Sequence, residues 1–278
     1  MTLYLKYRPQ TVEELNLKEV REQLQSLLTS KKPLPHAFLF TGPRGTGKTS
    51  AARILAKELD QNISLDLIEI DAASNRGIDE IRTLREQVAL APMQSKYKVY
   101  VIDEVHMLTT EAANALLKTL EEPPSHVIFI LCTTDPQKLP ETVISRCTRI
   151  QFKKPSIEEI VNKLKLVVES EKAKIEDLEL IAKEAKGSFR DAIKILEQVI
   201  SSGKSTREVL GLIASADPEE FIKRLRDEDT KQSLDFINNL VNQGVNLRTF
   251  IERCVEVLRE ELLETHDKKI IDLIEEFE

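Results

Sequence analysis

Short apolar segments alternate with amphipathic segments over the first half of the chain. Five of the apolar segments have the near-continuous hydrophobic character that is typical of strands covered on both faces. They lie at residues 37–41, 67–70, 99–103, 127–132 and 149–152. Apolar positions at helical spacing separate them, at 49–59, 77–90 and 110–120. This alternation predicts an α/β domain with a parallel five-stranded sheet and flanking helices.

Only helical patterns follow residue 154. Ser156 and Glu159 stand three residues apart after Pro155, and this capping box predicts the start of a helix. Further helices are predicted at 178–186, 189–200, 219–226, 233–241, 247–263 and 269–277. Boundaries near residue 153 and in the Gly- and Ser-containing segment 201–205 predict three domains, at 1–153, 154–203 and 204–278.

The first predicted strand runs directly into GPRGTGKT, residues 42–49, and a predicted helix follows. The pattern G-x-x-x-x-G-K-T between a strand and a helix is typical of a loop whose backbone N–H groups bind phosphate. The residues expected to contact the nucleotide are Gly42, Pro43, Arg44, Gly45, Thr46, Gly47, Lys48, Thr49 and Ser50. Lys48 would reach the terminal phosphates of ATP, and the Thr49 hydroxyl would bind Mg²⁺. The alternative is a glycine-rich turn that binds no ligand.

Two carboxylates end the third predicted strand, in VYVIDE at 99–104. Asp103 is suited to hold Mg²⁺ through water, and Glu104 is suited to polarise an attacking water as a catalytic residue. Either carboxylate alone is equally compatible with a solvated acidic strand end. Both together, downstream of a phosphate loop, favour hydrolysis of the nucleotide.

Composition narrows the class of protein. The net charge is −7, so a nucleic-acid contact must come from a local basic cluster or from several subunits acting together. The chain has no run of 18 apolar residues and no apolar signal core at its start. Its three cysteines are widely spaced, and its four histidines lack metal-ligand spacing. We therefore expect a cytoplasmic protein that contacts no membrane and binds no zinc.

Several longer motifs resemble those of one family. They are EIDAASNRGIDEIR (69–82), YVIDEVHMLT (100–109), ANALLKTLEEPP (113–124), TTDPQKLPETVISRC (133–147) and GSFRDAI (187–193). In these segments the chain resembles the bacterial DNA polymerase III gamma/tau subunits, which are the AAA+ ATPases of the sliding-clamp loader. The resemblance covers residues 4 to about 200. It implies a P-loop AAA+ domain, a small helical lid domain and a partial helical collar domain.

The resemblance also implies a role for each matching residue. Thr134 resembles the sensor-1 residue near the γ-phosphate, and Arg190 resembles sensor 2, which reaches the nucleotide from the lid. Tyr7, Arg8 and Pro9 resemble the N-terminal segment that lies near the adenine. Simpler roles stay open, because Thr134 is also suited to cap the following loop. The alternative for Arg190 is an ordinary arginine on a helix surface, and the alternative for Pro9 is stiffening of the N-terminal arm.

Arg146, in the segment VISRC, resembles the arginine finger that acts in trans on the ATP of a neighbouring subunit. Arginines that act in this way stabilise charge on the transferred phosphoryl group and contribute on the order of 10³–10⁵ in rate. The alternative is an ordinary surface arginine. The prediction is that this chain supplies half of each active site that it helps to form.

Arg76 and Arg82 lie in the densest basic region of the first domain. By resemblance they match the helices of a clamp loader that follow the DNA backbone. Contacts of this kind would be insensitive to sequence and sensitive to salt. The alternative is a solvated helix face on which Asp79, Glu80 and Glu86 are the partners of these arginines.

The predicted function is that of an ATP-hydrolysing motor subunit of the DNA polymerase III holoenzyme, the DNA-directed DNA polymerase (nucleotidyltransferase) complex of the replication fork. The implied partners are other gamma/tau copies, the delta and delta-prime subunits, the sliding clamp and primer–template DNA. One alternative is a delta-prime-like stator subunit that hydrolyses nothing. Another is a DNA branch-migration motor. The intact phosphate loop and the Asp103–Glu104 pair disfavour the stator, and the acidic net charge disfavours the motor.

Three features depart from the pattern of the family. Residues 60–66 contain no cysteine where the family usually carries a four-cysteine zinc module, which again implies that zinc is absent. The segment EELNLKEV (13–20) lacks the usual Gly-Gln, so contacts to the base there stay open. The sequence ends at Glu278 without a full collar domain or a tau extension, which indicates a short natural form or a fragment.

Overall fold

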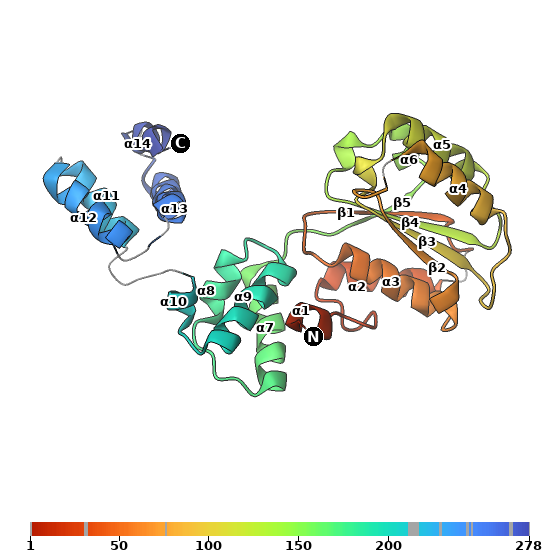
Figure 1. Ribbon diagram of the computed structural model, residues 1–278, viewed down its shortest axis with the longest axis horizontal. Coiled ribbons are helices and arrows are strands. Elements are labelled where there is room, and N and C mark those ends of the chain that lie inside the picture. The colour runs from red at the N-terminus through yellow and green to blue at the C-terminus, as the bar shows by residue number, and fades with distance from the viewer. Residues whose placement is uncertain are drawn as a thin grey trace. The chain divides into compact units, whose positions relative to one another are not determined.

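The computed structural model describes residues 2–30, 33–75, 77–210, 217–227, 230–242, 245, 247–266 and 269–277. Contacts between residues divide the chain into two compact units, Met1–Glu197 and Gln198–Glu278 (Figure 1). The first unit contains both the predicted sheet domain and nearly all of the predicted lid. The boundary proposed near residue 153 therefore stays a prediction drawn from the sequence pattern.

A parallel five-stranded sheet forms the centre of the first unit, as the alternating pattern predicts. Its strands are β1 (Ala37–Thr41), β2 (Leu67–Asp71), β3 (Lys98–Asp103), β4 (Val127–Thr133) and β5 (Thr148–Gln151). They are arranged in the order β2-β3-β4-β1-β5. Asp71 pairs with Asp103, and Thr41 pairs with Thr133. The carboxyl ends of four strands therefore meet at one edge, which is where open parallel sheets hold ligands.

Helices cover both faces of the sheet (Figure 1). On one face, α4 (Ile78–Val88) and α5 (Thr110–Glu121) pack on side chains such as Tyr100 and Phe129, whose rings stack at 5.4 Å. On the other face, α2 (Lys18–Thr29) and α3 (Lys48–Leu59) lie against the sheet. Burial on both faces explains why β1 and β4 are fully buried along their whole length.

Several short elements escaped the sequence prediction. They are α1 (Leu3–Lys6), the 3₁₀ turns η1 (Ile63–Leu65), η2 (Val105–Met107) and η3 (Pro136–Lys138), and the helices α6 (Glu141–Ile144) and α10 (Thr206–Val209). Helix α2 was also missed, although its buried residues Val20 and Leu24 stand at helical spacing. Elements of one turn carry too little periodicity to be recognised from the sequence alone.

Buried Asp66 organises the segment 60–66, in which the sequence predicts no zinc module. Its carboxylate accepts hydrogen bonds from the backbone N–H groups of Met93 at 2.6 Å, Gln94 at 2.9 Å and Ser95 at 3.0 Å. Burial alone would raise the pKa of Asp66, but these donors outweigh it and lower the pKa to about 2. The residues described contain no group of three or more His, Cys, Asp or Glu side chains able to hold a metal ion. The absence of zinc stays a prediction.

Three helices complete the first unit, α7 (Ile157–Glu171), α8 (Leu178–Glu184) and α9 (Phe189–Ser202), the last of which crosses the unit boundary. The predicted capping box is confirmed, because the Ser156 hydroxyl accepts from the Glu159 N–H and the Glu159 carboxylate accepts from the Ser156 N–H. The N-terminal arm contacts α7. Both Lys6 and the Tyr7 hydroxyl donate to Glu171 Oε1 at 2.6 Å.

The second unit is helical, as predicted. It contains α10 (Thr206–Val209), α11 (Pro218–Arg226), α12 (Thr230–Asn242), α13 (Leu247–Thr265) and α14 (Lys269–Phe277). The rings of Phe221, Phe236 and Phe250 pack together at centroid distances of 5.4–6.0 Å and form the centre of its core. Among all the helices described, none has the length and the apolar character that crossing a membrane requires.

Candidate nucleotide-binding site

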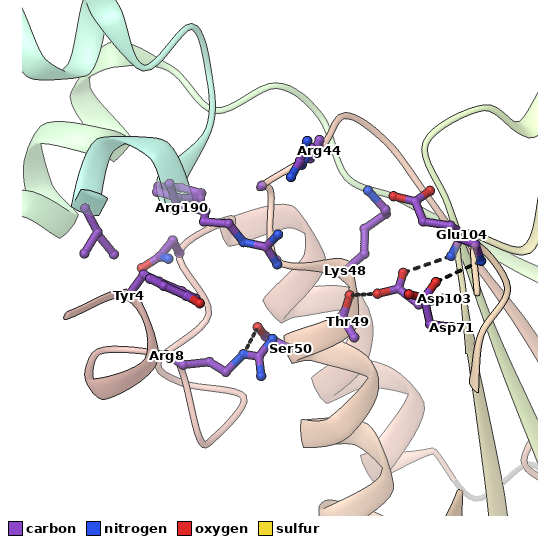
Figure 2. A pocket seen from close by; sticks show the side chains of 16 residues that line it. Tyr4, Arg8, Arg44, Lys48, Thr49, Ser50, Asp71, Asp103, Glu104 and Arg190 are labelled. Atoms are coloured by element: carbon purple, nitrogen blue, oxygen red, sulfur yellow. Dashed lines mark hydrogen bonds between the residues drawn. The ribbon is translucent and has the colours of Figure 1, made fainter. Parts of the chain in front are cut away.

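The phosphate loop connects β1 to α3 at the carboxyl edge of the sheet (Figure 2). Gly45 and Gly47 have φ angles of +78° and +100°, which side chains with a Cβ rarely adopt. A Cβ on Gly45 would also lie 2.0 Å from Ser188 Oγ. The backbone N–H of Phe189 donates to the Gly45 carbonyl oxygen at 3.1 Å. The glycine therefore permits both the curvature of the loop and its contact with the first turn of α9.

Lys48 begins α3 and is buried, with a side chain that folds back over the loop. Its Nζ donates to the carbonyl oxygens of Gly42 at 2.8 Å and Pro43 at 2.9 Å. Desolvation lowers the pKa of Lys48, and the nearby carboxylate of Glu104 partly offsets this shift. An anion would satisfy this cation better than neutral carbonyl groups do, so the amine is suited to bind phosphate.

Thr49 and Asp103 are joined by a hydrogen bond of 2.7 Å from Thr49 Oγ1 to Asp103 Oδ2. The other carboxylate oxygen, Oδ1, accepts from the backbone N–H of Glu104 at 3.1 Å. A hydroxyl and a carboxylate side by side provide the hard oxygen donors that Mg²⁺ prefers. The donor set therefore fits the predicted Mg²⁺ site.

Glu104 follows Asp103 with φ 49° and ψ 43°, in the left-handed region. Such a backbone costs on the order of 1–3 kcal/mol for a residue other than glycine, and residues of this kind are enriched at active sites. The left-handed backbone makes the Glu104 side chain point in a different direction from the Asp103 side chain. Figure 2 shows the Glu104 carboxylate beside the Lys48 amine. Thr134 Oγ1 donates to Glu104 Oε2 at 3.0 Å, so the predicted sensor residue and the predicted base are in contact.

One pocket joins these groups (Figure 2). Of the predicted residues, those that line it are Arg8, Arg44, Gly45, Gly47, Lys48, Thr49, Ser50, Asp103, Glu104 and Arg190. The sequence prediction missed six further lining residues, namely Tyr4, Asn16, Asp71, Ala73, Phe189 and Ile193. Arg8 is held by a 3.0 Å hydrogen bond from its Nε to Ser50 Oγ. Tyr4 belongs to the unpredicted helix α1, and Asp71 ends a strand in the manner of Asp103, a signal that could have identified it.

Other predicted residues lie outside the lining of this pocket. The Tyr7 hydroxyl is turned to Glu171, and Pro9 borders a smaller cavity with Gln10 and Arg53. Gly42, Pro43 and Thr46 form the body of the loop, where Thr46 Oγ1 donates to the Pro43 carbonyl oxygen at 2.9 Å. Contacts of Tyr7 and Pro9 with adenine stay predictions.

Arg146 follows α6 and does not line the pocket of its own chain. Its guanidinium donates to the Thr142 carbonyl oxygen at 2.7 Å and pairs with Glu121. Arg82 is exposed on α4 and pairs with Asp79 at 3.2 Å. Arg76 lies outside the described residues.

Comparisons with known proteins agree with the motifs. The family model of the DNA polymerase III delta subunit matches residues 58–156, and that of the DNA polymerase III clamp loader subunit ATPase lid domain matches 159–205. In sequence, the chain is 44% identical over 290 residues to DNA polymerase III subunit tau of Bacillus subtilis, covering 94% of this chain and 51% of that protein. It is 37% identical over 282 residues to subunit tau of Escherichia coli, covering 91% and 44%.

The chain thus spans about half the length of these tau proteins. It covers more of subunit gamma of Buchnera aphidicola subsp. Schizaphis graminum, with 35% identity over 282 residues, 91% of this chain and 77% of that protein. The solved Holliday junction branch migration motor RuvB of Thermotoga maritima shares the fold, at a TM-score of 0.59 and 21% identity over 79% of each chain. The fold is therefore that of P-loop AAA+ proteins, and the chain belongs to the gamma/tau family of DNA polymerase III clamp-loader subunits.

Proposed function

We propose that this chain is an ATP-hydrolysing motor subunit of a sliding-clamp loader. The observation that carries the proposal is the convergence of Lys48, the Thr49–Asp103 pair and Glu104 in one pocket. These groups supply a phosphate-binding cation, hard ligands for Mg²⁺ and a carboxylate base, which is the set that hydrolysis of ATP requires. A clamp-loader subunit would couple ATP binding to opening of the clamp, and hydrolysis to its release on primed DNA.

Each of the chain's own groups has one task in this mechanism. The Lys48 amine would exchange the Gly42 and Pro43 carbonyl oxygens for oxygens of the terminal phosphates. Thr49 and Asp103 would hold Mg²⁺, which when bound neutralises charge on the phosphates. Glu104 would orient and polarise the attacking water, with one of its oxygens held by Thr134.

The contact between the phosphate loop and α9 supports a role for the lid in sensing nucleotide. Phe189 donates its N–H to Gly45, and the next residue, Arg190, lines the pocket. A ligand that moved the loop would therefore displace the first turn of α9. We assign Arg190 to the sensor-2 role on this basis, and Arg8 together with Tyr4 to the nucleoside end of the pocket.

Arg146 is assigned to catalysis in trans. Its absence from the lining of its own pocket and its position beside Glu121 support this role. The phosphates of ATP bound to a neighbouring copy, or to another loader subunit, would lie against this arginine. The proposed partners are therefore other gamma/tau, delta and delta-prime subunits, the clamp and primer–template DNA. Arg82 would contact phosphate groups of that DNA. In the cell this work belongs at replication forks, and the polymerase reaction of the holoenzyme would belong to other subunits.

The main competing function is that of a delta-prime-like stator, which donates an arginine and hydrolyses nothing. The match to the delta-subunit model over residues 58–156 is the observation in its favour. A stator does not need a buried lysine, a pair of metal ligands and a carboxylate on a strained backbone in the same pocket. That combination supports the motor.

The test is ATP binding and hydrolysis by the protein assembled with its loader subunits, clamp and primed DNA. Glu104→Gln should keep nucleotide binding and lose hydrolysis by about 10²–10⁴-fold, because the general base is removed. Lys48→Ala should lose binding as well. Glu58→Gln, an exposed carboxylate on α3, is the matched control and should behave like the wild type. Undiminished hydrolysis in both Lys48→Ala and Glu104→Gln would favour the stator.

A further inference from the structure

His106 lies two residues after Glu104, in the turn η2, and has no part in the mechanism above. Its side chain is only 9% exposed, although imidazole is polar. Its Nδ1 lies 2.9 Å from Thr133 Oγ1 and 3.4 Å from Glu104 Oε2. A buried ring placed against the carboxylate that would serve as the catalytic base calls for an explanation.

The neighbours of His106 decide which ring nitrogen carries the proton. Ionised Glu104 can only accept hydrogen bonds, so a bare Nδ1 would direct its lone pair at a negative oxygen. A proton on Nδ1 removes this repulsion, since the N–H then donates to Thr133 Oγ1 and turns a positive hydrogen rather than a lone pair toward the side of Glu104. The Thr133 hydroxyl oxygen already accepts from the Asp135 N–H at 3.0 Å, and it has a second lone pair for His106. The geometry therefore selects the Nδ1–H form of the ring.

Two groups then contact the same oxygen of Glu104, one by a hydrogen bond and one by charge. The Thr134 hydroxyl is at 3.0 Å and the His106 ring at 3.4 Å from Oε2. The end of β4 fixes both the Thr134 hydroxyl and the His106 ring. Thr133, the last residue of β4, is fully buried and hydrogen-bonds the ring, and Thr134 follows it directly. The strands β3 and β4 are neighbours in the sheet. This network therefore joins Thr133, at the end of β4, to Glu104 and His106, which follow β3.

Lys48 pulls the carboxylate in another direction. Figure 2 shows its amine beside Glu104, and the charge of Glu104 acts to raise the pKa of Lys48 against the effect of desolvation. A carboxylate that rotated into a full ion pair with this lysine would no longer face an attacking water. The left-handed backbone at Glu104 directs the side chain but leaves its own torsions free. The contacts of Thr134 and His106 with Oε2 oppose that rotation.

We propose that His106 is a positioning residue for hydrolysis, which holds Oε2 of Glu104 and couples the base to Thr133 at the end of β4. This inference rests on the proposed function, because it assigns His106 a role only through Glu104. It differs from a role in stability alone, since a histidine that merely filled space would be replaceable by any side chain of similar volume.

The test compares three substitutions in the assembled loader. His106→Ala should lower kcat by roughly 10–100-fold while the affinity for nucleotide stays within twofold, because misplacement of a reacting group affects the chemical step. His106→Asn should recover most of the activity, because its side-chain amide can donate from the position of Nδ1. His106→Gln, whose amide lies one bond further out, should not. Equal activity in all three variants would overturn the inference.

A double substitution separates this inference from the proposed function. In a Glu104→Gln background, adding His106→Ala should cost no further activity, because the two residues act as one unit. If Glu104→Gln alone leaves hydrolysis intact, Glu104 is not the base and the inference fails, whereas the proposed function fails only if Lys48→Ala leaves hydrolysis intact as well. If Glu104→Gln abolishes hydrolysis but His106→Ala does not lower it, the inference alone is wrong.

A spectroscopic measurement does not depend on turnover or on the folding of variants. The ring ¹⁵N chemical shifts of His106 in the unsubstituted protein report which nitrogen carries the proton. We expect the Nδ1–H form. Observation of the Nε2–H form would leave the lone pair of Nδ1 beside the Glu104 carboxylate and overturn the inference.

Discussion

The backbone N–H of Phe189 donates a hydrogen bond of 3.1 Å to the carbonyl oxygen of Gly45. This bond joins the phosphate loop to the first turn of α9, across more than 140 residues of sequence. The side chain of Ser188 fills the space where a Cβ on Gly45 would lie. A displacement of the phosphate loop would therefore either carry the first turn of α9, and with it Arg190, or break the hydrogen bond between Phe189 and Gly45.

Gly45→Ala should disrupt both the loop and its contact with α9. The new Cβ would meet Ser188 Oγ at 2.0 Å, and φ +78° is itself costly for alanine, by about 1 kcal/mol or more. We expect nucleotide affinity to fall by tenfold or more in equilibrium titration. Gly203→Ala is the matched control, with φ +65° and no neighbour within 4 Å. It should lower the free energy of unfolding by about 1 kcal/mol and leave binding unchanged. Equal affinities in the two variants would contradict this account.

Thr134→Val should lower hydrolysis without weakening binding. Valine keeps the shape of threonine but lacks the hydroxyl that donates to Glu104 Oε2 at 3.0 Å. We expect kcat to fall by roughly 10–100-fold in steady-state assays, because the carboxylate loses an orienting donor. Thr134→Ser retains the hydroxyl and should retain most of the activity. A loss of the same size in Thr134→Ser would indicate that packing, rather than the hydrogen bond, is responsible.

Asp66→Asn should destabilise the fold near neutral pH. The carboxylate accepts three backbone hydrogen bonds through its two oxygens, and an amide replaces one oxygen by an NH2 donor, which leaves at least one of these N–H groups without an acceptor. The expected loss is about 1–3 kcal/mol in the free energy of unfolding, measured by denaturant titration. The exposed neighbour Gln61 offers a control, because Gln61→Ala should change the free energy little.

The same carboxylate predicts a dependence on pH. Its pKa is about 2 in the folded protein and 3.8 as the ordinary value, so its stabilisation is fully present above pH 3.8. It is lost progressively as the pH falls toward 2, where the folded state also becomes protonated. The difference in stability between the wild type and Asp66→Asn should therefore shrink over that interval. A difference that stays constant down to pH 2 would contradict the assignment.

Local patterns predicted the sheet and the centre of the site. The strands were recognisable because burial on both faces leaves continuous apolar runs, and β1 and β4 are fully buried. Lys48, Thr49, Asp103 and Glu104 were recognisable because strand ends and the loop place them at one edge of the sheet by topology alone. Such residues owe their positions to neighbours in sequence or to the order of the strands.

Residues brought in by distant contacts were missed. Tyr4 reaches the pocket from a four-residue helix. The amine of Lys194 in α9 lies over the Tyr4 ring, 5.7 Å from its centroid. The role of His106 depends on Thr133, which only the pairing of β3 with β4 brings near. No spacing in a single sequence records these contacts, because they join elements whose relative placement is set by packing of the whole unit.

Arg146→Ala provides the sharpest test of catalysis shared between subunits. The guanidinium is about one-third exposed, pairs with Glu121 and does not line its own pocket. Substitution should leave nucleotide binding by this chain intact and lower hydrolysis in the assembled loader by on the order of 10³-fold or more. Arg82→Ala, which removes an exposed arginine paired with Asp79, is the control for loss of charge. In the absence of DNA it should hydrolyse ATP like the wild type.

Mixing two inactive variants distinguishes action in trans from action in cis. A subunit with Arg146→Ala keeps its own phosphate loop, and one with Lys48→Ala keeps its own arginine. In a mixed assembly, some interfaces combine the intact pocket of the first with the intact arginine of the second. Hydrolysis should therefore rise above that of either variant alone, with a maximum near equal proportions. If Arg146 acted on the nucleotide of its own chain, no interface would contain a complete site and mixing would restore nothing.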